Sequence, residues 1–207
     1  MKRCRLPRWL AALALPALLP WAQATTVIAP DFDELANSAD YVVRATVKSM
    51  TSEWRPNPDN PKHPYIGTRV ELEVHEVIKG NPPSPLVLDL VGGRIGDEEL
   101  TISGAPKFVV GQENILFVRG NGRQIVPLVG MTHGQYLVRR DQATGKAFVM
   151  RSNGRYLYST DEVALPESAS SAVPARNPHA APLTVADFAA RIRSVIRNPE
   201  DTRERLD

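Results

Sequence analysis

The sequence predicts a mainly β protein: an antiparallel OB-like β-barrel with additional hairpins, a short N-terminal helix and a C-terminal helix. Apolar and polar residues alternate through several short segments, as they do in an antiparallel sheet with one solvated face. Turn signals separate these segments at intervals of about ten residues, which is typical of barrels and sandwiches rather than of βαβ units. A capping pattern before this region and an apolar stripe after it indicate the two helices.

The N-terminus predicts a secretory signal peptide over residues 1–24. Four basic residues without an acid precede a continuous apolar run at 9–21, and Ala22–Ala24 is a small-x-small cleavage site. That run is shorter than the roughly 20 residues that a helix needs to cross a bilayer. Cleavage after Ala24 would leave a periplasmic or secreted chain without cysteine, because Cys4 is the only one.

The composition of the remaining chain narrows the class of partner. Without the four basic residues of the signal peptide, 21 Lys and Arg stand against 23 Asp and Glu, a formal charge of −2. We expect no nucleic-acid partner, because that binding needs a clustered basic surface. No later apolar run approaches membrane length, so we expect no membrane span after cleavage. Neither a cofactor motif nor the spacing of a metal site is present, and we predict none of either.

A β-barrel domain is predicted over residues 25–165. Asp31 precedes Glu34 by three positions, as in a capping box, so a short helix is expected over 31–39. Strands are expected over 41–50, 68–80, 86–93, 115–119, 123–128, 136–140, 146–150 and 155–159. A proline-rich loop fills 55–67, an irregular acidic loop fills 94–107, and the loop 142–145 joins two later strands. Asn121-Gly122 and Asn153-Gly154 are predicted to be two-residue hairpin turns.

The C-terminal part divides into a linker and a helix. Residues 166–182 are rich in Pro, Ala and Ser without periodicity, which indicates a linker, and 183–207 are expected to form a helix and tail. Thr184 is a suitable N-cap with Asp187 three residues later, and Leu183 can pack onto Phe188. The apolar stripe of this helix is expected to dock on the barrel.

The segments DELANSADYVVRATV, VELEVHEVIKG, LVLDL and FVVGQENILFV follow one another within residues 32–119. In this order they resemble netrin-like modules and tissue inhibitors of metalloproteinases, and also uncharacterised exported bacterial proteins. The resemblance implies a five-stranded OB-type barrel. Those inhibitors act through an N-terminal cysteine that chelates the zinc of the target. Here the expected mature N-terminus is Thr25, so the resemblance extends to the fold and not to that chemistry.

His133 is the first candidate for a functional residue. It lies between Gly130 and Gly134, whose freedom at positive φ predicts a sharp turn in the sheet. No second ligand or general base stands at a recognisable spacing. We therefore interpret the stretch as a bend that lies beside a binding surface.

Acidic residues offer two possible cation sites. Glu71, Glu73 and His75 share one face of a strand, but a solvated face opposite an apolar one is the simpler interpretation. The acids 97–99 could supply oxygens to calcium, but their loop lacks the spacing of an EF-hand.

The sequence favours an exported, non-catalytic module that binds a protein or a cell-envelope component. Aromatic residues are common at interfaces. The candidate binding residues are Trp54, Tyr65, His133, Tyr136, Tyr156 and Tyr158. The alternative is a hydrolase or metal-dependent enzyme that uses His133 with Ser103 or with the acidic residues Asp97, Glu98 and Glu99. Ser103 stands outside any G-x-S-x-G motif.

Overall fold

The computed structural model describes residues 29–58, 60–166 and 181–196. The predicted signal peptide, nearly all of the linker and the tail beyond residue 196 lie outside these ranges. The strands are β1 (Tyr41–Arg55), β2 (Tyr65–Lys79), β3 (Leu86–Val91), β4 (Gly93–Ile95), β5 (Glu98–Leu100), β6 (Glu113–Val118), β7 (Gln135–Arg140) and β8 (Ala147–Arg151). The helices are α1 (Phe32–Ser38) and α2 (Val185–Val195), and the 3₁₀ turns are η1 (Met131–Gly134) and η2 (Thr160–Ala164).

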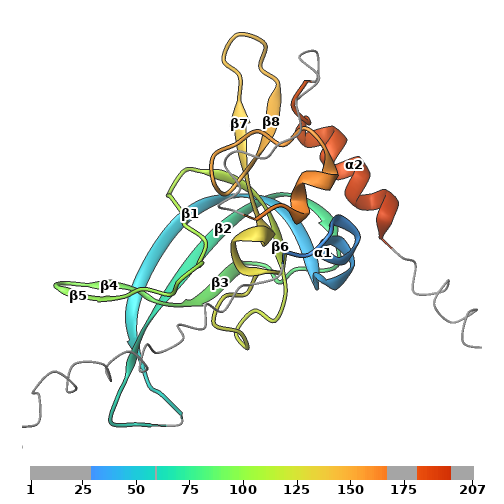
Figure 1. The fold of residues 1–207 in the computed structure, drawn as a ribbon. Coiled ribbons are helices and arrows are strands. Elements are labelled where there is room, and N and C mark those ends of the chain that lie inside the picture. The colour runs from blue at the N-terminus through green and yellow to red at the C-terminus, as the bar shows by residue number, and fades with distance from the viewer. Residues whose placement is uncertain (1–28, 59, 167–180, 197–207) are drawn as a thin grey trace, which may run out of the picture.

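Six of the strands form one antiparallel sheet in the order β3-β2-β1-β6-β7-β8 (Figure 1). The hairpin of β1 and β2 is its longest part, with 15 residues in each strand. β4 and β5 form a separate two-stranded ribbon. The mainly β class is confirmed. Within the described residues the sheet is open, with β3 and β8 as its two edges.

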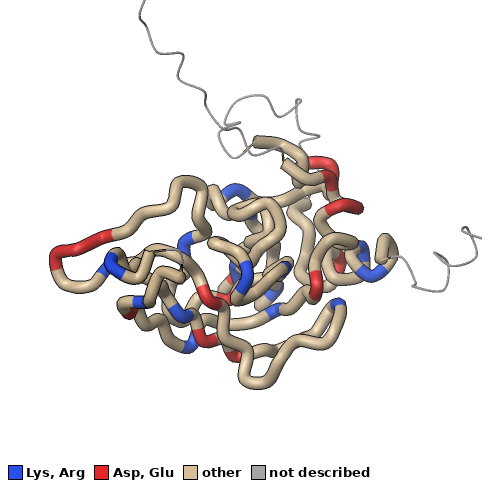
Figure 2. Tube along the Cα trace, turned by 90° about the horizontal axis from the view of Figure 1, so that it is seen from below, with Lys and Arg blue, Asp and Glu red and all other residues tan. Residues whose placement is uncertain are grey.

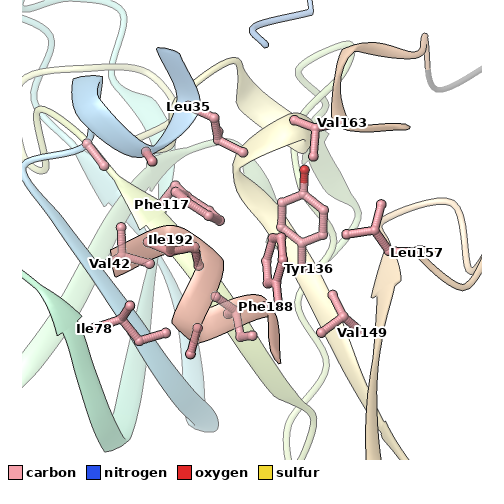
Figure 3. Close-up of a cluster of buried hydrophobic side chains, with 14 of the residues drawn as sticks. Leu35, Val42, Ile78, Phe117, Tyr136, Val149, Leu157, Val163, Phe188 and Ile192 are labelled. Carbon is pink, nitrogen blue, oxygen red and sulfur yellow. The ribbon is translucent and has the colours of Figure 1, made fainter. Parts of the chain in front are cut away.

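The two helices cover one side of the sheet. Phe117 of β6 and Tyr136 of β7 meet Phe188 of α2 there, and the ring centroids of Tyr136 and Phe188 are 5.0 Å apart (Figure 3). Leu35 of α1 and Val163 of η2 complete the cluster. The expected docking of the C-terminal helix is therefore confirmed.

A second apolar cluster lies on the opposite face of the sheet. Its largest share comes from alternate residues of β1, β2 and β3. The buried members are Tyr41, Val43, Ala45, Val47, Val70, Leu72, Leu86, Leu88, Leu90, Leu116, Val118, Val126 and Leu128. Near the helices the sheet is apolar on both faces, since Val42 and Val43 are both fully buried on opposite sides.

Local capping signals give both helices the starts that the sequence predicts. The Asp31 carboxylate accepts a 2.7 Å hydrogen bond from the N–H of Glu34. The Thr184 hydroxyl accepts one of 3.1 Å from the N–H of Asp187. These bonds satisfy backbone donors that have no partner inside the helix.

Two of the predicted strands do not form. An isolated bridge between Val118 and Leu128 is the only sheet pairing found for residues 123–128. Pro127 lies next to it and has no N–H to donate to a ladder. Residues 155–159 likewise pair with β8 through one isolated bridge, from Tyr156 to Met150. Conversely, the loop predicted over 94–107 contains most of the β4–β5 ribbon.

Neither Asn-Gly pair makes the predicted two-residue hairpin. Asn121-Gly122 lies within the longer loop enclosed by the Val118–Leu128 bridge. A type I′ turn also needs a positive φ at Asn121, and among the described non-glycine residues only Met131 has one.

The turn at Asn153-Gly154 is tight but has three residues. Arg151 N–H bonds to the carbonyl of Arg155 at 2.8 Å, and Gly154 N–H bonds to the carbonyl of Arg151 at 2.9 Å. Gly154 has a φ of +80°. This is the pattern of a three-residue loop that ends in a left-handed glycine.

The loop after β6 bonds to the edge of β3. The side-chain amide of Asn121 donates to the carbonyl of Val87 at 2.7 Å and accepts from the N–H of Asp89 at 3.0 Å. The carbonyl of Ile125 accepts from the N–H of Val91 at 2.9 Å. Much of the polar edge of β3 is therefore satisfied without a further strand.

Candidate functional site

An apolar groove of about 630 Å³ lies between the sheet and the segment 99–109. Thr68, Val70 and Leu90 of β2 and β3 line it on the sheet side, together with Met50 of β1. The remaining lining residues are Val91, Gly92, Gly93, Glu99, Leu100, Thr101, Ile102, Ser103, Gly104, Ala105, Pro106, Lys107, Phe108 and Val109. A concave and mostly apolar site with a few polar groups is the usual form of a binding site.

Large apolar side chains remain exposed at this groove. Met50 is 40% exposed and Val109 is 59% exposed, and both line it. Val110, the next residue, is 60% exposed. A single exposed apolar residue is ordinary on a protein surface, but adjoining ones that border a groove indicate a binding surface.

Two buried amides anchor the segment that carries these valines. Gln135 donates to the carbonyl of Lys107 at 2.8 Å and to the side-chain oxygen of Asn114 at 3.2 Å. Asn114 in turn donates to the carbonyl of Gln112 at 2.9 Å. Because buried amides are costly to leave unpaired, this network restrains the segment on both sides of Val109.

The turn that follows Val109 is bonded to β1. Gln112 N–H closes the turn on the carbonyl of Val109 at 3.0 Å. Val47 then exchanges two hydrogen bonds with it, from Gly111 N–H at 2.8 Å and to the carbonyl of Gln112 at 3.0 Å. The exposed valines therefore lie on a fixed turn beside the strand that carries Met50.

The β4–β5 ribbon crosses the β1–β2 hairpin next to the groove. At Gly93 a Cβ would stand 2.2 Å from Thr68 Oγ1 and 2.6 Å from Ser52 Oγ, so only glycine permits this approach. The two hydroxyls are 2.9 Å apart, and Thr68 also bonds to the carbonyl of Gly92. Beyond the crossing the ribbon projects past β1 (Figure 1), and Figure 2 shows acidic residues at its tip.

Trp54 and Tyr65 lie near the far end of the hairpin on opposite faces. Trp54 pairs with Ile66, and Tyr65 pairs with Arg55. Residues directly opposite in a sheet share a face, and consecutive residues do not. The predicted aromatic surface is therefore divided between two faces here. Trp54 projects on the face of Met50 but lies beyond the ribbon crossing at Ser52.

The other three candidate tyrosines lie elsewhere in the fold. Tyr136 is 2% exposed and belongs to the core beneath α2 (Figure 3). Tyr156 is half-buried against Phe148 with ring centroids 6.2 Å apart. Tyr158, also half-buried, precedes η2 and donates its N–H to Glu162. None of the three lines the groove.

His133 is 8% exposed and lies in η1, where the chain turns before β7. The predicted turn is confirmed, and Gly130 has the expected positive φ of +59°. Gly134 is needed for a different reason, since a Cβ there would stand 2.7 Å from the carbonyl oxygen of Val129. Ser103 lines the groove, and no hydrogen bond joins it to His133 in the described ranges.

The acidic candidates are occupied by other contacts or stand apart. Glu71 pairs with Lys48 at 2.7 Å and accepts from Ser49 at 3.1 Å, and these two bonds lower the pKa of its carboxyl. His75 shares a 2.8 Å hydrogen bond with Thr46. In the part of the chain that the structure describes, no three His, Cys, Asp or Glu side chains are grouped so that they could hold a metal.

The groove itself was not predicted. Its sheet side combines residues of three strands, and its other side is a segment that the sequence marks only as irregular. The one local signal is Val109-Val110 immediately before Gly111, two apolar residues at a turn where polar ones are usual.

None of the helices in the described ranges has the length and apolar character needed to cross a membrane.

Comparison with known proteins identifies no relative of this chain. No protein-family model matches the chain, and a search of the curated proteins finds none that is significantly similar.

Proposed function

We propose that this chain is an exported binding module that holds a partner protein of the cell envelope on the groove surface, meaning the groove with Met50, Val109 and Val110. The exposure of these three side chains beside a concave apolar site carries the proposal. Fully burying one such side chain contributes about 1.5–3 kcal/mol. Part of this is already gained in the free protein, and association has its own cost, so a moderate affinity is expected.

An OB-like barrel is the proposed architecture of the module. The bonds of Asn121 and Ile125 to β3 support it, because they join the loop after β6 to the outer edge of the sheet. The second apolar cluster would then be the interior of the barrel. The resemblance to netrin-like modules favours the same architecture. Export is supported by the order of basic, apolar and small residues in 1–24.

Site-specific photo-cross-linking tests the binding function. A photoreactive benzoyl-phenylalanine replaces Val109 in cells that produce the protein, and in a control it replaces Ile125, which is 56% exposed on a different loop. We expect a discrete adduct from position 109 and none from 125. Adding Met50→Asp should remove that adduct. Equal adducts from both positions, or none from either, would contradict a specific surface at the groove.

N-terminal sequencing tests export. The protein recovered from the envelope fraction or the medium should begin at Thr25. A protein that retains Met1 in the cytoplasm would exclude the proposed location.

A further inference from the structure

Half of β1 has a strand on one side only. β6 pairs with β1 over residues 41–46, and the turn that ends at Gln112 closes on Val47. From residue 48 to Arg55, the backbone of β1 pairs with β2 alone among the described segments, and the register with β2 runs without interruption from Ser49 onward. The side of this stretch that faces away from β2 is therefore an open sheet edge, although β1 is an inner strand in the order of the sheet.

The outward-pointing backbone groups of this edge can be assigned. Gly92 N–H bonds to the carbonyl of Ile66, so Ile66 directs its backbone groups toward β3. Backbone direction alternates along a strand. Thr68 and Val70 therefore direct their backbone groups toward β3 as Ile66 does. Their partners on β1 are Ser52 and Met50, and the partner of Ile66 is Trp54. The N–H and C=O groups of these three β1 residues consequently point away from β2. No backbone hydrogen bond joins these three residues to any other segment of the described chain.

We propose that the partner adds a strand to this edge of β1, in line with β6. The proposal rests on the function proposed above and specifies how the partner is held. An unpaired row of backbone donors and acceptors is satisfied by an extended chain, the mode known as strand addition. Seven residues from Ser49 to Arg55 offer an edge of about 23 Å.

The side chains along the edge specify the partner further. Met50 and Trp54 project on the same face as their partners Val70 and Ile66, and both are substantially exposed. Cross-strand apolar pairs stabilise a sheet, so an added strand with apolar residues at alternate positions fits this face. Val109 borders the same groove as Met50 and would contact the same side chains.

The ribbon adds a charge requirement. It crosses β1 at Ser52 and continues beyond the free edge (Figure 1), and its exposed residues Asp97, Glu98 and Glu99 form the acidic tip in Figure 2. An added strand would pass beside these acids, so Lys or Arg in the partner would be attracted. A second copy of this chain would instead bring its own acidic ribbon to the same place. The geometry therefore favours a basic, alternately apolar strand over a second copy.

Two features limit pairing with unsuitable chains. β1 has an irregularity in register at Lys48, and the ribbon covers part of the face at Ser52. Bulges, lysine and covering segments are common protections of natural sheet edges. They restrict the edge to a strand whose side chains suit it.

The test uses a synthetic peptide in which Val alternates with Lys and Thr, at millimolar concentration, and the amide hydrogen exchange of the protein measured by NMR. We expect the amides of Met50, Ser52 and Trp54 to exchange about tenfold more slowly with the peptide present. A peptide with an N-methyl group on every valine keeps the side chains but loses the row of backbone donors that faces β1, and it should give no protection. Replacing Lys by Glu in the peptide should weaken binding.

The outcomes separate this inference from the function on which it rests. Protection that survives N-methylation, or no protection of the three amides, would overturn strand addition. An adduct at position 109 would in that case still support the groove as a binding surface. Protection that appears without peptide and rises with protein concentration would make the occupant a second copy, which also overturns the proposal. Protection by the peptide without any adduct at 109 supports the edge and counts against the groove.

Discussion

Lys79, the last residue of β2, donates a 2.7 Å hydrogen bond to the carbonyl oxygen of Ala39, directly after α1. Its ammonium also bonds to the carbonyls of Ala36 and Asn37, each at 2.8 Å. The carbonyls at the end of a helix have no partner within the helix and carry the negative end of its dipole. A residue far away in sequence therefore caps α1. Partial burial lowers the pKa of the Lys79 ammonium.

Replacing Lys79 should loosen α1. Lys79→Met removes the donor from three carbonyls and should lower the free energy of unfolding by about 1–3 kcal/mol, measured by urea unfolding. Lys48→Met is the matched control, because Lys48 makes only an exposed ion pair, which solvent screens and which contributes little to stability. Equal losses of unfolding free energy in the two variants would show that the bonds of Lys79 to the end of α1 stabilise the protein no more than an exposed ion pair does.

A chain of charges connects α2 with four strands. Arg193 bonds to Glu76 at 2.6 Å, Arg44 lies between Glu76 and Glu113, and Arg140 lies 3.4 Å from Glu113. The Arg193 guanidinium, more than Arg44, holds the pKa of the Glu76 carboxyl below its ordinary value of 4.5. The folded pKa is thus lower than the unfolded one. The resulting stabilisation is present above pH 4.5 and is lost as the pH falls through the folded pKa.

Acid should therefore destabilise the native protein more than a variant without this carboxylate. Urea unfolding of the native protein and of Glu76→Gln, at about pH 6 and about pH 3, gives the comparison. The difference in unfolding free energy between the two proteins should shrink at the lower pH. A difference that is the same at both values would show that Glu76 is not stabilised as a carboxylate.

Asn121 should control the exchange of one amide in β3. Asn121→Ala removes the acceptor of the Asp89 N–H and the donor to Val87, so the Asp89 amide should lose protection. The Val91 amide should keep its protection, because its acceptor is the backbone carbonyl of Ile125. Loss of stability is expected to be about 1–3 kcal/mol. Unchanged exchange at Asp89 would refute the bond.

The two Asn-Gly glycines should respond alike to a β-branched residue. Gly122 has a φ of +76° and Gly154 one of +80°, and a Cβ at either position meets no atom within 4 Å. Gly122→Val and Gly154→Val should each cost about 1–3 kcal/mol through backbone strain alone. Gly154→Asn should cost less, since Asn tolerates this conformation. Losses below about 0.5 kcal/mol would exclude strain.

The sequence predicted what depends on neighbours along the chain. The caps at Asp31 and Thr184 act over three residues, and strands such as β1 follow from alternation within one segment. The role of Asn121 could not be predicted this way, because its partners in β3 lie more than 30 residues earlier. Local pattern marks Asn-Gly as a turn, and only the fold shows that the amide serves a distant strand.

The candidate site was harder to predict from the sequence, because it also depends on contacts between residues far apart in the chain. Aromatic content suggested Tyr136, yet its register opposite Ile115 directs it into the helix-covered core. Met50 carried no signal as part of an alternating strand. β6 begins at Glu113, opposite Thr46, so the part of β1 that carries Met50 has only β2 as a paired neighbour and Met50 stays exposed.

The burial of β1 on both faces has a consequence for how the chain finds its alignment. Val42 and Val43 are equally buried and chemically identical, so sliding β1 by one position against β6 would exchange one valine for the other at the start of the strand. At these two positions hydrophobicity cannot reject the mistake, so the rejection falls to the polar residues on either side of them. Asp40 would lose the bond from its N–H to the carbonyl of Val118 and the bond that its carboxylate accepts from the N–H of Gly120, both at 2.8 Å. Arg44 would be turned away from Glu113, with which it pairs at 2.8 Å. The alignment of the central strands is thus decided by the polar residues Asp40 and Arg44, which lie on either side of the two valines.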